Sequence, residues 1–258
     1  MPAAIDEFQD VLFAAQLSDA AYTDRWHELL SFEGEATVNI LRFRNVTAVV
    51  ARRADKAYLA IPGVSEWRDI RDVLDGRWRV FVGHEFPAGI LSHTHGVYEL
   101  LVSHRREIKK AWEGASELII AGHSLGGGVA ASLPLLLQTI QPYTQFPRVR
   151  RVYTFCTPRY AIRPTHPAFY TCTNFLNIGD VISLIPSVSG LRRGRFGANV
   201  WVSSDHEFFG KVKVTRHIRE LFRVVCHGWP FTASSRRDIH SVRRLIQTIE
   251  KVLHVLQD

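Results

Sequence analysis

The pattern of apolar and polar positions predicts helices near both ends of the chain and alternating strands and helices between them. Apolar residues recur at helical spacing over residues 8–30 and 241–256, and residues 96–112 form a third amphipathic stretch. Runs rich in β-forming residues lie at 38–43, 48–52, 57–61, 118–121, 149–156 and 174–178, with shorter ones at 200–202 and 212–214. Strands that alternate with helices predict an α/β fold, with a mainly parallel sheet covered by helices on both faces.

One local pattern indicates chemistry. The apolar run 118–121 leads into Gly122-His123-Ser124-Leu125-Gly126, and small apolar residues follow. A strand, a tight turn and a helix around Gly-x-Ser-x-Gly predict a nucleophile elbow, in which the serine is strained and its flanking glycines allow strand and helix to cross closely. Ser124 is therefore the predicted nucleophile. The N–H of Leu125, at the start of the helix, would face a developing oxyanion. A chance match to the motif is the alternative, and the flanking elements argue against it.

A serine hydroxyl needs a histidine to accept its proton and a carboxylate to orient that histidine. On this architecture both follow the serine in the chain, the acid first. Asp180 comes after the apolar run 175–178, at the carboxyl end of a predicted strand. His240 stands immediately before the last predicted helix. The sequence leaves three other histidines open as the base: His206, His217 and His227.

Four segments in chain order carry a family resemblance. They are Gly-His-Ser-Leu-Gly-Gly at 122–127, Tyr-Thr-Phe-Cys-Thr-Pro-Arg at 153–159, Asn-Ile-Gly-Asp-Val-Ile at 177–182 with Pro186, and His240 before a closing helix. Over about residues 10–250 the chain resembles the class 3 lipases, the fungal-lipase-like branch of the α/β-hydrolases. The resemblance implies an α/β-hydrolase fold and a Ser124-His240-Asp180 triad. It also implies hydrolysis of lipid or small esters through an acyl-enzyme, with no metal or organic cofactor.

The family's oxyanion signature is only partly kept. In the family, this signature is Arg-Gly-Thr/Ser followed, after four residues, by Asp-Trp. This chain keeps the spacing but has Pro62-Gly63-Val64 and, after four residues, Asp69-Ile70. The resemblance makes Val64 the second oxyanion residue, although it offers an N–H and no hydroxyl. Loss of one oxyanion donor costs about a hundredfold in turnover. We expect either slow activity or a replacement contact from Ser65.

The family places its lid after this segment, and residues 65–74 suit a short amphipathic helix with Ser65 as its N-cap. Its apolar face would comprise Trp67, Ile70, Val73 and Leu74. A helix packed permanently on the core is the alternative. A lipase-like protein kept for binding or signalling is the second functional hypothesis, motivated by Pro62 and Val64. Acyl transfer to an acceptor other than water would use the same residues as hydrolysis.

Composition bounds the class of protein. The 258 residues, 46 % of them hydrophobic, suffice for one well-buried core, and no linker or repeat divides them. We expect a single domain over residues 1–258. No secretory signal peptide is expected, because acidic residues stand near the start of the chain where such a peptide needs basic ones. No membrane span is expected either, because glycines and Pro134 interrupt the uncharged residues 118–146. A cytoplasmic location and reduced Cys156, Cys172 and Cys226 follow from this interpretation.

The net charge of +7 comes mainly from arginine, with 26 Arg against 6 Lys. Nucleic acid is not an expected partner, because no basic region is interleaved with aromatic residues on a recognisable binding module. A solvated basic surface and peripheral contact with an anionic membrane both stay open. The hypothesis for such contact is that Arg192-Arg193-Gly194-Arg195 and Arg236-Arg237 converge at the mouth of the site. Together with the expected location, the charge favours phospholipid or monoacylglycerol over bulk triglyceride. The sequence does not indicate an oligomeric state.

Overall fold

The structure is a computed structural model. It describes residues 2–22, 36–63, 78–140, 146–162, 170–178, 180, 183, 193–203, 208–209 and 243–257. All structural statements below concern these residues.

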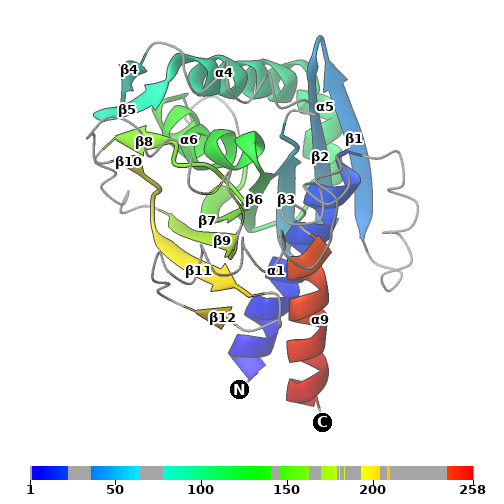
Figure 1. Cartoon of the computed structure of the whole chain (residues 1–258). Coiled ribbons are helices and arrows are strands. Elements are labelled where there is room, and N and C mark those ends of the chain that lie inside the picture. The colour runs from blue at the N-terminus through cyan, green and yellow to red at the C-terminus, as the bar shows by residue number, and fades with distance from the viewer. Residues whose placement is uncertain are drawn as a thin grey trace.

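An eight-stranded sheet forms the centre of the fold (Figure 1). Its spatial order is β1 (Thr37–Phe43), β2 (Val46–Arg53), β3 (Lys56–Ile61), β6 (Glu117–His123), β7 (Arg148–Phe155), β9 (Thr171–Asn177), β11 (Ala198–Val202) and β12 (Phe208–Phe209). The strands from β3 to β11 pair in parallel, whereas the pairs β1–β2, β2–β3 and β11–β12 are antiparallel. The predicted mainly parallel sheet is confirmed.

Helices cover both faces of this sheet, also as predicted. Successive residues of β6 belong to different cores, because side chains alternate across a strand. Leu118 and Ile120 pack with the first core, which includes residues of α4 (Ala88–Ser103), α5 (Arg105–Ala111) and α6 (Leu125–Ile140). Ile119 and Ala121 pack with the second, which includes residues of α1 (Pro2–Ala20) and α9 (Arg243–Gln257). Burial on both faces explains why the central strands read as continuous apolar runs.

A second sheet, which the sequence analysis did not anticipate, has four strands in the order β10 (Arg193–Gly194), β8 (Ala161–Ile162), β5 (His84–Pro87) and β4 (Trp78–Phe81). Its pairs are antiparallel. β4 and β5 form a hairpin whose turn uses positive φ at Val82 and Gly83, 48° and 77°. Val80, 73 % exposed, lies on this hairpin. The strands are too short to give a clear alternation in the sequence.

Two predicted helices differ from those in the structure. The stretch 96–112 was expected to form one helix, but α4 already begins at Ala88, and His104 separates it from α5. Gly96, the expected start, lies inside α4, where a Cβ would come within 2.9 Å of Val46 Cγ2. Glycine therefore permits close packing there rather than starting the helix. The helix expected over 8–30 ends at Ala20 as α1, and residues 23–35 lie outside the described part.

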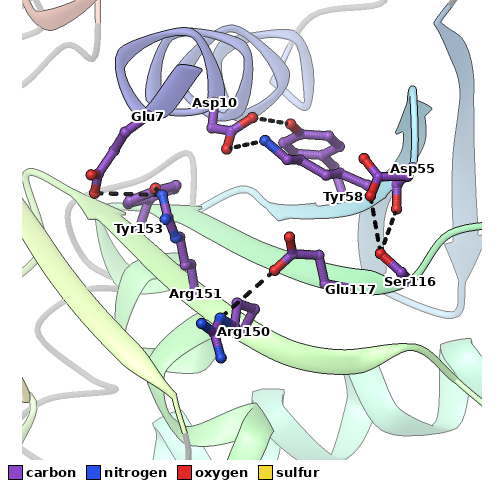
Figure 2. A network of polar contacts seen from close by, with 10 residues as sticks. Glu7, Asp10, Asp55, Tyr58, Ser116, Glu117, Arg150, Arg151 and Tyr153 are labelled. Carbon is purple, nitrogen blue, oxygen red and sulfur yellow. Dashed lines mark hydrogen bonds and ion pairs between the residues drawn. The ribbon is translucent and has the colours of Figure 1, made fainter. Parts of the chain in front are cut away.

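Polar contacts fix α1 over the sheet (Figure 2). Asp10, which is buried, accepts hydrogen bonds from Lys56 Nζ and from the Tyr58 hydroxyl, each at 2.7 Å. Glu7 and Arg151 form an ion pair at 3.5 Å. Burial raises the pKa of Tyr58, so its hydroxyl remains a donor at neutral pH. These contacts join one helix to β3 and β7. Within the described residues, no helix is long and apolar enough to cross a membrane.

Candidate active site

The turn between β6 and α6 has the conformation that the motif predicted. Ser124 lies in the left-handed region with φ of 54°, which is costly for a residue with a side chain. Its N–H donates to the carbonyl of Phe155 on β7 at 2.9 Å, and its carbonyl accepts from Gly127 N–H at 3.0 Å. These bonds hold the strained residue at the carboxyl end of β6.

Two glycines allow strand and helix to cross closely at this turn. A Cβ at Gly122 would overlap the carbonyl oxygen of Gly126, and a Cβ at Gly126 would overlap that of Ile61 at the end of β3. A Cβ at Gly127 would lie 2.7 Å from Thr157 Oγ1. The motif therefore has glycine where no side chain fits.

The hydroxyl of Ser124 is buried, with the residue 1 % exposed, and makes no hydrogen bond to any residue that the structure describes. Buried hydroxyls normally have a partner. The predicted base His240 and the three alternatives, His206, His217 and His227, lie outside the described residues. Leu125 is the first residue of α6, so its N–H belongs to the helix turn whose donors have no partner within the helix.

The structure brings Asp180 to the same edge of the sheet. β9 is the parallel neighbour of β7, which is in turn the parallel neighbour of β6, so their carboxyl ends lie side by side. Asp180 follows the end of β9 and is 1 % exposed. Its N–H donates to Asn177 O at 3.2 Å, and its Oδ2 accepts from the Ser183 hydroxyl at 2.8 Å. A carboxyl group is thus buried two strands away from the strained serine.

Tyr22, just beyond the end of α1, contacts the elbow and was missed in the sequence. Its hydroxyl accepts a hydrogen bond from Gly63 N–H at 2.6 Å and lies 2.8 Å from His123 Nδ1. Gly63 N–H can only donate, so the Tyr22 hydroxyl keeps its own proton, which it can donate to His123 Nδ1 when that nitrogen is unprotonated. The residue is 39 % exposed, but its hydroxyl end is held inside, and burial raises the pKa of Tyr22. The hydroxyl therefore stays protonated at neutral pH.

Gly63, the residue before Val64, packs directly against the elbow. A Cβ at Gly63 would lie 2.8 Å from Ser124 Cβ and 2.9 Å from the carbonyl oxygen of His123. Val64 itself and the predicted lid residues, Ser65, Trp67, Ile70, Val73 and Leu74, lie outside the described residues. The last described residue before the predicted oxyanion residue, Gly63, therefore lies beside Ser124.

Comparison with known proteins shows a likeness to lipases. Residues 65–189 match a family described as lipase (class 3). A search of curated proteins by sequence gives no match. The fold is similar to a lipase from Rhizopus microsporus var. chinensis, with TM-score 0.59, 17 % identity, and 80 % of this chain and 76 % of that chain covered. The chain is similar to the class 3 lipases.

Two more solved structures extend this likeness. Lipase II from Rhizopus niveus has TM-score 0.57 and 20 % identity, over 78 % of this chain and 82 % of that chain. A triacylglycerol lipase from Penicillium expansum has TM-score 0.55 and 16 % identity, over 77 % of this chain and 80 % of that chain. The resemblance to class 3 lipases and the α/β-hydrolase fold are thereby confirmed. The matched segment includes Ser124 and Asp180 and ends before His240.

Cys156 has an unusual backbone conformation beside the site. It lies just after β7 with a positive φ of 49°. Its N–H donates to Phe175 O at 2.8 Å, and its side chain is 2 % exposed. Burial raises the pKa of the Cys156 thiol, with a smaller contribution from Asp180, so the thiol is neutral.

Cysteine and metal chemistry can be described for part of the chain. Cys156 and Cys172 are buried free thiols, as predicted, and Cys226 lies outside the described residues. Among the residues that the structure describes, no group of three His, Cys, Asp or Glu side chains is placed to hold a metal ion.

The hypothesis that Arg195 belongs to a basic surface at the mouth of the site is wrong. This residue is only 9 % exposed, and its guanidinium donates to backbone carbonyls inside the protein. It cannot contact a membrane from that position. The sequence placed it in an arginine-rich run and gave no sign that it turns inward.

Proposed function

We propose that this protein is a serine carboxylester hydrolase that acts on lipid esters. Lipid ester hydrolysis is supported by the lipase family match and by the fold. The assignment of roles is our own: Ser124 as nucleophile, His240 as general base and Asp180 as the acid that orients it. The observation that carries the proposal is the strained, buried Ser124 at the sheet edge where Asp180 is also buried.

The reaction would proceed in two steps. Ser124 Oγ attacks the ester carbonyl carbon while His240 takes the hydroxyl proton. When the carbon–oxygen bond to the alcohol breaks, His240 returns that proton to the leaving oxygen, and an acyl group remains on Ser124. Water, deprotonated by His240, then attacks the acyl-enzyme and releases the carboxylic acid and the serine.

The oxyanion of each tetrahedral intermediate would be held by the N–H groups of Leu125 and Val64. Support for Leu125 comes from its place at the start of α6, where the helix dipole favours negative charge. Support for Val64 comes from Gly63, which lies against Ser124 and is held by the Tyr22 hydroxyl. Because Val64 lacks a hydroxyl, we expect slower turnover than with threonine or serine at this position.

Phospholipid or monoacylglycerol is the proposed substrate class. The net charge of +7 would favour peripheral contact with an anionic lipid surface. A related structure carries the name triacylglycerol lipase, so triglyceride is the competing substrate. Residues 65–74, with Trp67, Ile70, Val73 and Leu74 on one face, form the proposed lid.

We also propose that the whole chain forms one catalytic domain. Helices from its two ends, α1 and α9, pack side by side on one face of the sheet (Figure 1). Arg243 of α9 and Asp19 of α1 approach to 3.3 Å. α9 begins shortly after the proposed base His240, and its docking on α1 fixes this following part of the chain against the sheet.

Hydrolysis of p-nitrophenyl esters of short and long acyl chains tests the assignment. Ser124→Ala should lower kcat by at least about a thousandfold, because it removes the nucleophile. Ser103→Ala, an exposed position at the end of α4, is the control and should keep wild-type turnover. Wild-type rates in folded Ser124→Ala would refute the assignment. A folded wild type that is inactive even with lipid vesicles would favour the binding or signalling role.

A further inference from the structure

Arg195 is buried close to the proposed catalytic acid. It lies between β10 and β11 and is 9 % exposed. Its Nε and Nη2 donate to the carbonyl oxygen of Thr157 at 2.9 and 2.7 Å. The same Nη2 also donates to the carbonyl oxygen of Ser183. One guanidinium therefore joins two segments that leave neighbouring strands.

Those two segments flank the proposed site. Thr157 follows Cys156 at the end of β7, and its side chain contacts the first turn of α6 at Gly127. Ser183 holds the Asp180 carboxylate through its hydroxyl, at 2.8 Å from Oδ2. The path from Arg195 to Asp180 thus runs through one intervening residue, and the other end of the bridge rests on the helix that begins after Ser124.

The backbone around Arg195 is itself held in place. Tyr160 N–H donates to Gly194 O at 3.1 Å, and Phe196 N–H donates to the Tyr160 hydroxyl at 2.9 Å. Asn174 Nδ2, from β9, donates to the carbonyls of Phe196 and Ala198 at 2.7 and 3.0 Å. Hydrogen bonds therefore fix the backbone before and after Arg195, and with it the position of the guanidinium.

The bridge from Arg195 to the carbonyls of Thr157 and Ser183 differs from an ordinary loop contact because it buries a positive charge. Burial lowers the pKa of Arg195 to about 10, so it is still a cation at neutral pH, and its hydrogen bonds go to neutral carbonyls. Asp180, a buried acid, acts in the opposite direction and raises that pKa. Among the described residues, the pKa of Arg195 also responds to Tyr160, Arg159 and Cys156, and the pKa of Cys156 responds to Arg244 of α9.

We propose that Arg195 is a positioning residue for catalysis, which fixes the segment that carries Asp180 and places a buried positive charge near it. The proposal rests on the triad assigned above. It assigns a function to an arginine that is buried and donates to backbone carbonyls. A buried cation without compensating contacts is strongly unfavourable, and the carbonyls of Thr157 and Ser183 supply such contacts to the Arg195 guanidinium.

The test uses the full-length chain with Arg195→Met, which removes charge and hydrogen bonds, and Arg195→Lys, which keeps charge without the planar fork. Arg195→Met should lower kcat about tenfold with little change in KM, because the acid is displaced. In the triad proposed above His240 accompanies Asp180, so loss of the Arg195 charge should favour the protonated imidazole and move the acid limb of the kcat/KM profile up by about one pH unit. Arg195→Lys should lower kcat but keep the wild-type acid limb.

Controls separate this role from folding and from the proposed function. Arg159→Met removes a neighbouring positive charge that is not part of the bridge, and it should retain kcat. Thermal unfolding gives the folded fraction of each variant at the assay temperature. If Arg195→Met does not fold, Arg195→Lys decides alone. Wild-type kcat in folded Arg195→Lys, or an unmoved acid limb in folded Arg195→Met, would overturn the inference. Wild-type hydrolysis that persists in Ser124→Ala would instead show that the triad assignment is wrong.

Discussion

At the residue scale, the hydroxyl of Tyr22 is the contact that the sequence could not reveal. It links Gly63 and His123, and His123 is 101 positions away in the chain. A single tyrosine after a helix carries no spacing signal for such a contact. The elbow, in contrast, is encoded locally, because Gly122, Ser124 and Gly126 each meet a steric requirement within a few residues.

Tyr22→Phe should therefore impair catalysis more than folding. Without the hydroxyl, Gly63 N–H loses its acceptor and the adjacent oxyanion segment is less well fixed beside Ser124. We expect kcat to fall about tenfold while KM stays within about twofold of the wild type, because a misplaced oxyanion donor weakens binding of the transition state more than binding of the substrate. Steady-state kinetics on a short soluble ester provide the measurement.

Tyr98→Phe, which removes the same atom from α4 outside the elbow, is the matched control and should have wild-type kinetics. Equal turnover in Tyr22→Phe and the wild type would show that the hydroxyl does not act through the oxyanion segment.

At the element scale, the strands of the main sheet were predicted better than the helices. β3 and β6 are buried on both faces, and such strands appear in the sequence as short continuous apolar runs. The start of α4 was missed because glycines at 89 and 96 interrupt its pattern, although Gly96 serves close packing against β2. The hairpin β4–β5 is too short for a period-2 pattern to stand out.

The docking of α1 on the sheet depends on a buried carboxylate (Figure 2). Asp10→Asn would leave Lys56 without its anion and weaken the bond from Tyr58. We expect a loss of about 2 kcal/mol in the free energy of unfolding, the scale for a broken, partly buried charge-assisted pair. Urea denaturation monitored by tryptophan fluorescence measures it.

Asp55→Asn makes the same chemical change at an exposed position, where the carboxylate accepts a hydrogen bond from Ser116. Its effect should be within about 0.5 kcal/mol of zero. An Asp10→Asn protein as stable as the Asp55→Asn control would mean that the buried contacts do not anchor α1.

At the scale of the whole molecule, the sequence predicted the α/β-hydrolase fold, with helices on both faces of a mainly parallel sheet. The elbow and the strand before Asp180 follow from local patterns. Arg195 does not, because its inward orientation depends on carbonyls at Thr157 and Ser183 that the fold brings to it. An arginine-rich run looks like surface until the tertiary contacts of each member are known.

Labelling with a fluorophosphonate probe, with the site mapped by peptide mass spectrometry, tests the central claim most directly. The tryptic peptide spanning residues 111–148 contains Ser116, Ser124 and Ser132, and fragmentation distinguishes them. We predict one label per chain, on Ser124, that is lost when the protein is denatured before exposure to the probe. A folded wild-type chain that takes no label in the presence of lipid vesicles, or takes it on another residue, would contradict the assignment of Ser124 as nucleophile.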